Sequence, residues 1–262
     1  MSETGGVDRA GRAPAGSPAV TADERWPPGV ARVLAPNPSP LTLEGTNTYL
    51  VEGWVVDPGP NDDQHLARVV ARAGSRARGI VLTHSHPDHA DAAEPLAAAL
   101  GGVPVVAPRE GEQVGPFVAV ATPGHALDHV CLFWQDVCFC GDLVAGRGSV
   151  LIPPERGALI AYLRSLERVR SLEPRVLCPG HGPPIWNPSR KLDEYIAHRL
   201  KREEMLLAAL AEGLREKPAL LDRAWFDVPP QLRPVAELNL RAHLWKLAEE
   251  GRLPADVDPA DY

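Results

Sequence analysis

Cysteine is scarce in this chain of 262 residues, which contains four. Cys131, Cys138, Cys140 and Cys178 all fall in segments that we predict to be strands, so we expect reduced, buried thiols rather than disulfides. Cys138 and Cys140 alternate along one strand with no turn between them, and they are poorly placed to converge on one ion. A closed structural zinc site, which relies on cysteine, is therefore not expected.

The chain also lacks a long apolar run and an excess of basic residues. No stretch is long and apolar enough to span a membrane, and residues 1–25 have no apolar core of the kind found in signal peptides. We therefore expect a disordered Gly/Ala/Pro-rich tail over residues 1–25, a cytoplasmic protein and no membrane partner. The formal net charge of −7 argues mildly against tight binding to nucleic acid.

Histidine is instead concentrated in one short segment. Residues 83–89 read Thr-His-Ser-His-Pro-Asp-His, which places His84, His86, Asp88 and His89 within six positions. The segment follows the apolar residues 79–82 and precedes a helical pattern, so we place it on a loop at the carboxyl end of a strand, where neighbouring side chains can point inward together. Imidazole and carboxylate ligands suit Zn²⁺ in sites that keep an open position for water. The cluster predicts a metal site.

Three further candidate ligands each follow a strand-like segment and a glycine: His125, Asp142 and His181. Glycine permits the backbone conformations that bring a side chain close to a shared centre. Together with the first four residues they suffice for two metals. His84, His86 and His125 would bind one ion, Asp88, His89 and His181 would bind the other, and Asp142 would bridge the two.

The remaining pattern alternates short strands with helices, which predicts a layered α/β fold. Strands are expected at 30–34, 49–51, 54–57, 79–83, 103–107, 117–121, 130–134, 137–140 and 175–178, and helices at 63–73, 90–100 and 158–172. Proline and glycine near 183–188 predict a boundary between a catalytic domain, 26–187, and a C-terminal helical domain, 188–262. Helices at 190–210, 218–225 and 234–250 would lead into a small wing, or into an ordinary tail.

The ligand pattern H-x-H-x-D-H, followed by a distant His, Asp and His, resembles that of the metallo-β-lactamase superfamily. That resemblance implies an αββα sandwich with the metals at one sheet edge, and here a small winged-helix-like C-terminal domain. A true β-lactamase is disfavoured, because the common zinc β-lactamases have Cys in place of Asp142. The segments 36–51, 141–142, 179–183 and 195–199 are similar to those of the β-lactamase-like protein 2 family, a family of single-stranded-RNA endonucleases, and the likeness runs from about residue 30 to residue 251.

The resemblance and the ligands imply a hydrolase. Two Zn²⁺ ions, or Mn²⁺ or Fe in their place, would hold a bridging hydroxide as the nucleophile, so that no side-chain nucleophile is needed. Asp88 and His129 are the candidate catalytic residues. His129 follows His125 by four positions and would hydrogen-bond a ligand or the leaving group, with a structural role as the alternative.

The substrate is predicted to be single-stranded RNA. Candidate phosphate contacts are Arg190, His198 and Arg199 after His181, and Arg147 and Ser149 after Asp142, although each could be an ordinary solvated side chain. A thioesterase of the glyoxalase II or acyl-carrier type is the alternative, since the same hydroxide could attack a small thioester. A metal-binding module without hydrolytic activity is a third possibility. The oligomeric state is not predicted.

Overall fold

The structure, a computed structural model, describes residues 25–262. Two five-stranded sheets form its centre. The first sheet has the order β1 (Ala31–Leu34), β2 (Asn47–Val51), β3 (Trp54–Val56), β4 (Gly79–Val81) and β5 (Val105–Val106). The second has the order β10 (Val176–Pro179), β9 (Val137–Gly141), β8 (Val130–Trp134), β7 (Phe117–Ala121) and β6 (Gln113–Val114). The predicted tail lies outside the described residues, apart from its last residue.

Each sheet contains both parallel and antiparallel strand pairs. β3 pairs with β4, β4 with β5 and β9 with β10 in parallel, and every other neighbouring pair is antiparallel. Parallel neighbours need crossover helices, and these helices cover the outer faces of the sheets. The carboxyl ends of β4, β9 and β10 consequently open at one edge of the sandwich.

Apolar side chains fill the space between the two sheets. Tyr49 and Val56 of the first sheet pack against Phe117, Leu132 and Phe139 of the second, and all five are buried. The ring of Phe139 lies edge-on to both Tyr49 and Phe117, with centroids 5.1 and 5.7 Å apart. Packing of these inward side chains fixes the register of the strands at the edge where β4, β9 and β10 end.

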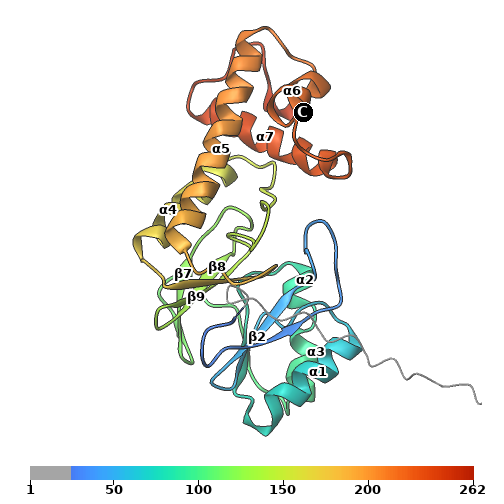
Figure 1. Ribbon diagram of the computed structural model, residues 1–262, viewed down its shortest axis with the longest axis vertical. Helices are drawn as coiled ribbons and strands as arrows, with labels where there is room; N and C mark the ends of the chain where they lie inside the picture. Colours follow the sequence, from blue (N-terminus) through green and yellow to red (C-terminus); the bar gives the residue numbers. More distant parts are fainter. Residues whose placement is uncertain (1–24) are drawn as a thin grey trace, which may run out of the picture.

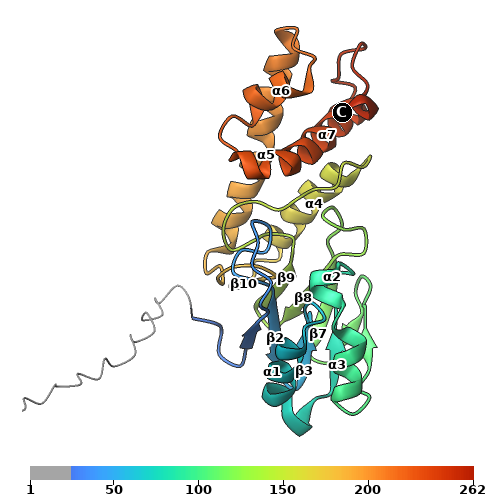
Figure 2. The same ribbon diagram turned by 90° about the vertical axis from the view of Figure 1, so that its right-hand side faces the viewer.

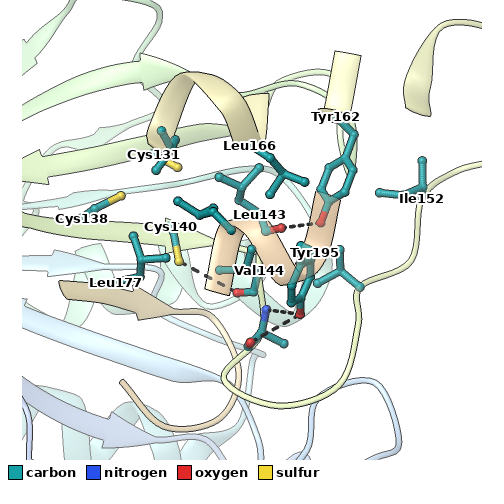
Figure 3. Packing of buried hydrophobic residues seen from close by; sticks show 14 of the residues in the cluster. Cys131, Cys138, Cys140, Leu143, Val144, Ile152, Tyr162, Leu166, Leu177 and Tyr195 are labelled. Atoms are coloured by element: carbon teal, nitrogen blue, oxygen red, sulfur yellow. Dashed lines mark hydrogen bonds between the residues drawn. The ribbon is translucent and has the colours of Figure 1, made fainter. Parts of the chain in front are cut away.

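Helices cover both outer faces, which completes the αββα sandwich expected from the sequence (Figure 2). On the first sheet lie α1 (Asp63–Ala73), with the 3₁₀ turn η2 (Gly74–Arg76), and α3 (Ala93–Ala99); buried Val69 and Leu96 contact Ile80. On the second sheet lie α4 (Ala158–Ser171) and the start of α5 (Pro188–Ala211). All four cysteines are free and buried, as predicted, and three of them face α4 and α5 (Figure 3).

A helical region extends the molecule along its long axis (Figure 1). The 24 residues of α5 connect the sandwich to α6 (Lys217–Ala224) and α7 (Arg233–Glu249), with the 3₁₀ turns η3 (Pro230–Leu232) and η4 (Pro259–Asp261). A separate apolar core joins Leu206, Leu221 and Trp225 to Leu240 and Leu244. After α7, residues 250–258 form turns, and residues 250–262 contain no strand.

The predicted helix at 90–100 is wrong at its start and in its continuity. Helix begins earlier, at Pro87, which occupies the first helical position of α2 (Pro87–Ala90), where its missing N–H costs nothing. The helix then breaks before α3 because the backbone of Gly59 takes hydrogen bonds from the helix backbone at that point. The Gly59 N–H donates to the His89 carbonyl and the Gly59 carbonyl accepts from the Ala92 N–H, both at 3.0 Å. His89 is thereby held inside a short helix rather than ahead of a long one.

In residues 25–262 no helix has the length and apolarity needed to cross a bilayer.

Glu203 anchors α7 to α5 through a buried ion pair. Its carboxylate accepts from Lys246 Nζ at 2.6 Å and from Arg252, and the side chains of Glu203 and Lys246 are 6% and 7% exposed. Glu203→Ala leaves the Lys246 ammonium buried with Glu250 alone, so we expect a loss of about 3 kcal/mol in the free energy of unfolding measured in urea. Glu204→Ala, which removes the exposed neighbour paired with Lys201, should change it by less than about 0.5 kcal/mol; equal losses would contradict this account.

Candidate metal centre

The seven predicted ligands lie together at the edge where the strands end. His84 and His86 follow β4, Asp88 and His89 lie in α2, and His125, Asp142 and His181 follow β7, β9 and β10. Three groups of three have the spacing of a metal site: His84 with His86 and His125, Asp88 with His89 and His181, and, outside the predicted sets, Asp57 with His84 and His89. The structure therefore brings together the same two sets that the sequence spacing suggested.

The first group is a convergence of ring nitrogens. His86 Nδ1 lies 3.1 Å from His84 Nε2 and 2.9 Å from His125 Nε2. A neutral ring carries one N–H, and the Nδ1 of both His84 and His125 faces an oxygen at 2.8–2.9 Å, so their Nε2 atoms direct lone pairs at the centre. Such lone pairs repel one another unless a proton or a cation lies between them.

The second group places a carboxylate against two rings. Asp88 Oδ2 lies 3.2 Å from His181 Nε2 and 3.6 Å from His89 Nε2. His89 Nε2 is buried and has no hydrogen-bond partner in the described part of the chain. A buried polar atom without a partner is rare in native proteins, and here it points between two carboxylates.

Asp142 lies between the two groups. Its Oδ2 is 3.5 Å from His125 Nε2 of the first group and 3.4 Å from His181 Nε2 of the second, and its Oδ1 is 3.4 Å from His89 Nε2. The side chain is 12% exposed. One carboxylate in contact with both groups has the position that a bridging ligand requires.

Hydrogen bonds from outside the centre orient four of the five rings. The Nδ1 atoms donate to oxygens of the surrounding protein: His84 to Thr83 Oγ1 (2.9 Å), His89 to Asp57 Oδ2 (2.9 Å), His125 to the Leu151 carbonyl (2.8 Å) and His181 to the Gly45 carbonyl (3.3 Å). A metal-binding histidine is held in this way, because the outer bond fixes both the tautomer and the ring plane. Each Nε2 is left directed at the centre.

Asp57 was not identified from the sequence as part of the site. It ends β3 with φ +50°, and its buried carboxylate accepts from the Thr83 backbone N–H, from Thr83 Oγ1 and from His89 Nδ1, at 2.7, 2.7 and 2.9 Å. Asp57 thus ties the loop after β4 to the ring of His89. The available signal was a carboxylate directly after a buried β-branched strand, but Asp57 lacks the preceding glycine that marked Asp142.

His129 contacts the backbone of Asp142. Its Nε2 accepts from the Asp142 backbone N–H at 3.1 Å, its Nδ1 donates to Thr122 Oγ1 at 2.8 Å, and the residue is 1% exposed. Burial, followed by the neighbouring His125, lowers the pKa of His129 to about 3, so the ring stays neutral. The expected hydrogen bond to a ligand residue is therefore present, and because both ring nitrogens are engaged within the protein we assign His129 a positioning role.

The electric field of the centre favours positive charge on the Asp142 side. Burial opposes protonation of His181, but the carboxylates of Asp142 and Asp88 outweigh it and raise the pKa of His181 to about 9. The same balance raises the pKa of His89 well above its ordinary value. Burial, with His89 and His129 nearby, lowers the pKa of His84 instead, so that ring is neutral and its Nε2 offers a lone pair to a cation. A site that attracts protons beside neutral imidazoles is suited to a divalent cation.

Two glycines make the close approach of these side chains possible. A Cβ atom on Gly180 would lie 2.5 Å from both Asp142 Oδ1 and His89 Cε1, and one on Gly141 would lie 2.6 Å from Thr83 Oγ1. Gly141 also has φ +43°, which disfavours other residues. Alanine at Gly180 would displace a candidate ligand, and alanine at Gly141 would displace Thr83, which orients the ring of His84.

The predicted substrate contacts lie mostly apart from this centre. Ser149 lines the cavity over the metal groups, of about 260 Å³, together with Leu41, Val150 and several of the candidate ligands. Arg147 pairs with Glu44 on the surface, and Arg190, which is 76% exposed, pairs with Glu194. Neither residue lines the cavity.

Arg199 and His198 belong to a different environment from the one expected. Arg199 is 2% exposed and donates to Asn239 Oδ1, Ser149 Oγ and the Val150 carbonyl at 2.9, 3.0 and 2.6 Å. His198 Nε2 accepts from Arg202, and burial, then Arg199, lowers the pKa of His198 to about 4. The predicted basic surface on this helix is therefore wrong for Arg199, whose charge is used to join α5 to the loop beside the metal groups.

The residues fit a metal centre, and comparison with known proteins agrees. The description of the Metallo-beta-lactamase superfamily matches residues 41–119 and 107–181, and that of the Beta-lactamase associated winged helix domain matches residues 218–256. The chain belongs to the metallo-beta-lactamase superfamily. The superfamily and fold expected from the ligand pattern are thus confirmed, as is a C-terminal winged-helix domain, and the chain is a hydrolase of that superfamily.

Relatives match over nearly the whole chain. The Beta-lactamase-like protein 2 homolog of Drosophila melanogaster is 31% identical over 276 residues, covering 90% of this chain and 92% of that protein. The Atrochrysone carboxyl ACP thioesterase of Aspergillus fumigatus is 32% identical over 258 residues, covering 88% and 76%. A metallo-beta-lactamase family protein from Thermus thermophilus has a TM-score of 0.70 at 26% identity, covering 88% and 97%.

Asp57→Asn tests how the ring of His89 is held. An amide would turn a donor toward either Thr83 or His89, so we expect metal affinity to fall by about 10- to 100-fold, measured by competition with a chromophoric chelator. Asp128→Asn, an exposed aspartate on the loop after His125, is the control and should retain wild-type affinity. Unchanged affinity in Asp57→Asn would show that the ring needs no such support.

Proposed function

We propose that this superfamily member is a dinuclear metal-dependent hydrolase of acyl thioesters, with two Zn²⁺ ions at the two groups and Mn²⁺ or Fe as alternatives. The observation that carries the proposal is the setting of the metal-centre cavity, which is small and is lined by Leu41, Val150 and Leu151, with no Lys or Arg among the described residues of its wall. A small carbonyl substrate fits such a cavity better than a polyanion does. The similarity to the fungal acyl-carrier thioesterase supports the same substrate class.

The candidate ligands would hold the ions, and one of them would accept the proton. His84, His86 and His125 would hold one ion, and Asp88, His89 and His181 the other, with Asp142 between them. When bound, the ions supply an activated water near neutral pH and polarise the carbonyl oxygen. Asp88 lines the cavity and is 30% exposed, so one of its oxygens can accept the proton that the attacking water loses.

The reaction then balances without any side-chain nucleophile. The water oxygen bonds to the carbonyl carbon, the carbon–sulfur bond breaks, and the departing thiolate takes the proton, which yields a carboxylic acid and a thiol. His129 and Asp57 take no part in these transfers, since they hold Asp142 and His89 in place.

We also propose that the chain divides into two domains at residues 187/188, with α5–α7 as a module beside the metal groups.

Single-stranded RNA is the second candidate, and a specific surface favours it. A hollow of about 500 Å³ is lined by Trp26, Arg32 and Arg147, which could stack a base and meet a phosphate. Arg147 is, however, paired with Glu44, Arg32 lies over the Trp26 ring, and the net charge of the chain is −7. We therefore place the thioester ahead of the RNA expected from the sequence.

The zinc-loaded protein, assayed in parallel on two substrates, tests the proposal. We expect hydrolysis of the octanoyl thioester of N-acetylcysteamine and no cleavage of end-labelled single-stranded RNA. The Asp88→Ala/His89→Ala variant, which removes two ligands of one group, should lose at least about two orders of magnitude in thioester turnover. It also serves as the control for contaminating nuclease or esterase.

RNA cleavage by the wild type and not by the variant, with intact thioester, would overturn the proposal in favour of the second candidate. Thioester hydrolysis at equal rates in both proteins would show that the metal groups are not the site of the reaction.

A further inference from the structure

A second cavity, of about 420 Å³, lies between α5, the segment from α6 to α7 and the loop at 148–150. One wall is mainly apolar, with Trp225, Val228, Leu232, Val235 and Ala236, and it also contains Asp227 and Asn239. The other wall is formed by α5 and is polar, with Tyr195 beside Lys191, Glu194, His198, Arg199 and Arg202. None of the candidate metal ligands lines this cavity.

This cavity adjoins the one over the metal groups. Leu41, Ser149 and Val150 line both, so these three residues form the partition between them. Leu41 is 49% exposed although it is apolar, and it belongs to a segment that crosses toward the helical region. A group attached to a carbonyl at the metals can therefore reach the second cavity over Leu41.

The charged residues in the α5 wall are already engaged within the protein. Arg199 is bonded to Ser149, Asn239 and the Val150 carbonyl. Arg202 is paired with Asp227 and donates to the Ala224 carbonyl at 2.6 Å. The Lys191 ammonium lies 5.2 Å from the Tyr195 ring centroid, and burial lowers the pKa of Lys191. The cavity thus favours an apolar occupant over an anionic one.

We propose that this cavity receives the acyl group of the substrate and sets its size and polarity; this inference rests on the proposed thioester hydrolysis. The acyl class is a bulky or extended apolar group, such as a medium-length aliphatic chain. Val235 and Leu232 of the α6–α7 side limit its far end, and Leu41 lies where it enters.

The thiol arm has a separate exit in this arrangement. Another hollow, of about 780 Å³, shares His86 and His125 with the metal-centre cavity and no residue with the acyl cavity. It is lined by loop residues that include Gly124, Leu127 and Arg156. The carbonyl would then lie at the metals, with the acyl group on the side of Leu41 and the thiol arm on the side of His125.

Filling the acyl cavity tests the assignment. Val235 is half-buried on α7, and Val235→Phe places a ring in the cavity, whereas Leu238→Phe makes a similar change on the same helix at a residue that does not line it. The zinc-loaded proteins would be assayed on the octanoyl and acetyl thioesters of N-acetylcysteamine, which differ only in the acyl group. We expect the octanoyl-to-acetyl ratio of kcat/KM to fall at least tenfold in Val235→Phe and to stay at the wild-type value in Leu238→Phe.

A second measurement separates this inference from the proposed function. Titration calorimetry of octanoate into the metal-loaded proteins should show weaker binding to Val235→Phe than to the wild type or to Leu238→Phe. Thioester hydrolysis with an octanoyl-to-acetyl ratio that Val235→Phe leaves unchanged would overturn the acyl cavity while the function stands. Octanoate binding that is weakened only in Val235→Phe, in a protein that hydrolyses no thioester, would support the cavity and overturn the function.

Discussion

Five imidazoles and two carboxylates share one buried edge of this sandwich, and their mutual approach is the constraint on which the other features depend. Ring nitrogens of three histidines lie about 3 Å apart, and Asp142 is in contact with rings of both groups. Such crowding is unfavourable for the protein alone and favourable around cations. The glycines before Asp142 and His181 permit that close approach, and the outer hydrogen bonds donated by four Nδ1 atoms orient the rings within it.

The rest of the sandwich fixes the positions of the strand ends that carry the ligand loops. Parallel pairing of β4, β9 and β10 with their neighbours brings strand ends to one edge, and the apolar layer between the sheets fixes their register. Asp57, just after β3, and His129, just before β8, then hold His89 and Asp142, so the ligand loops after β4 and β9 are each tied to a strand other than their own. The helical region adds a wall over this edge, and it uses Arg199, a residue that would otherwise be a free cation, to hold that wall against the loop at 148–150.

Local sequence pattern was sufficient for much of this structure. The nine expected strands follow from apolar runs, and the candidate ligands follow from the four runs that lead through Gly or Thr to a His or Asp, because strand ends and ligand loops are local features. The features that were missed depend on distant contacts. The break between α2 and α3 is caused by Gly59, thirty residues earlier in the chain, and the charge of Arg199 is satisfied by Asn239, forty residues later. The two-residue strand β6 was missed because only its pairing with β7 across a Gly-Pro turn defines it.

Anomalous diffraction from crystals grown with zinc would test the central claim of a two-metal centre most directly. The account predicts two peaks, one among His84, His86 and His125 and one among Asp88, His89 and His181, with Asp142 in contact with both. A single ion held by Asp57, His84 and His89, the third group with suitable spacing, would contradict it. That outcome would mean that Asp57 is a ligand and that the site holds one metal.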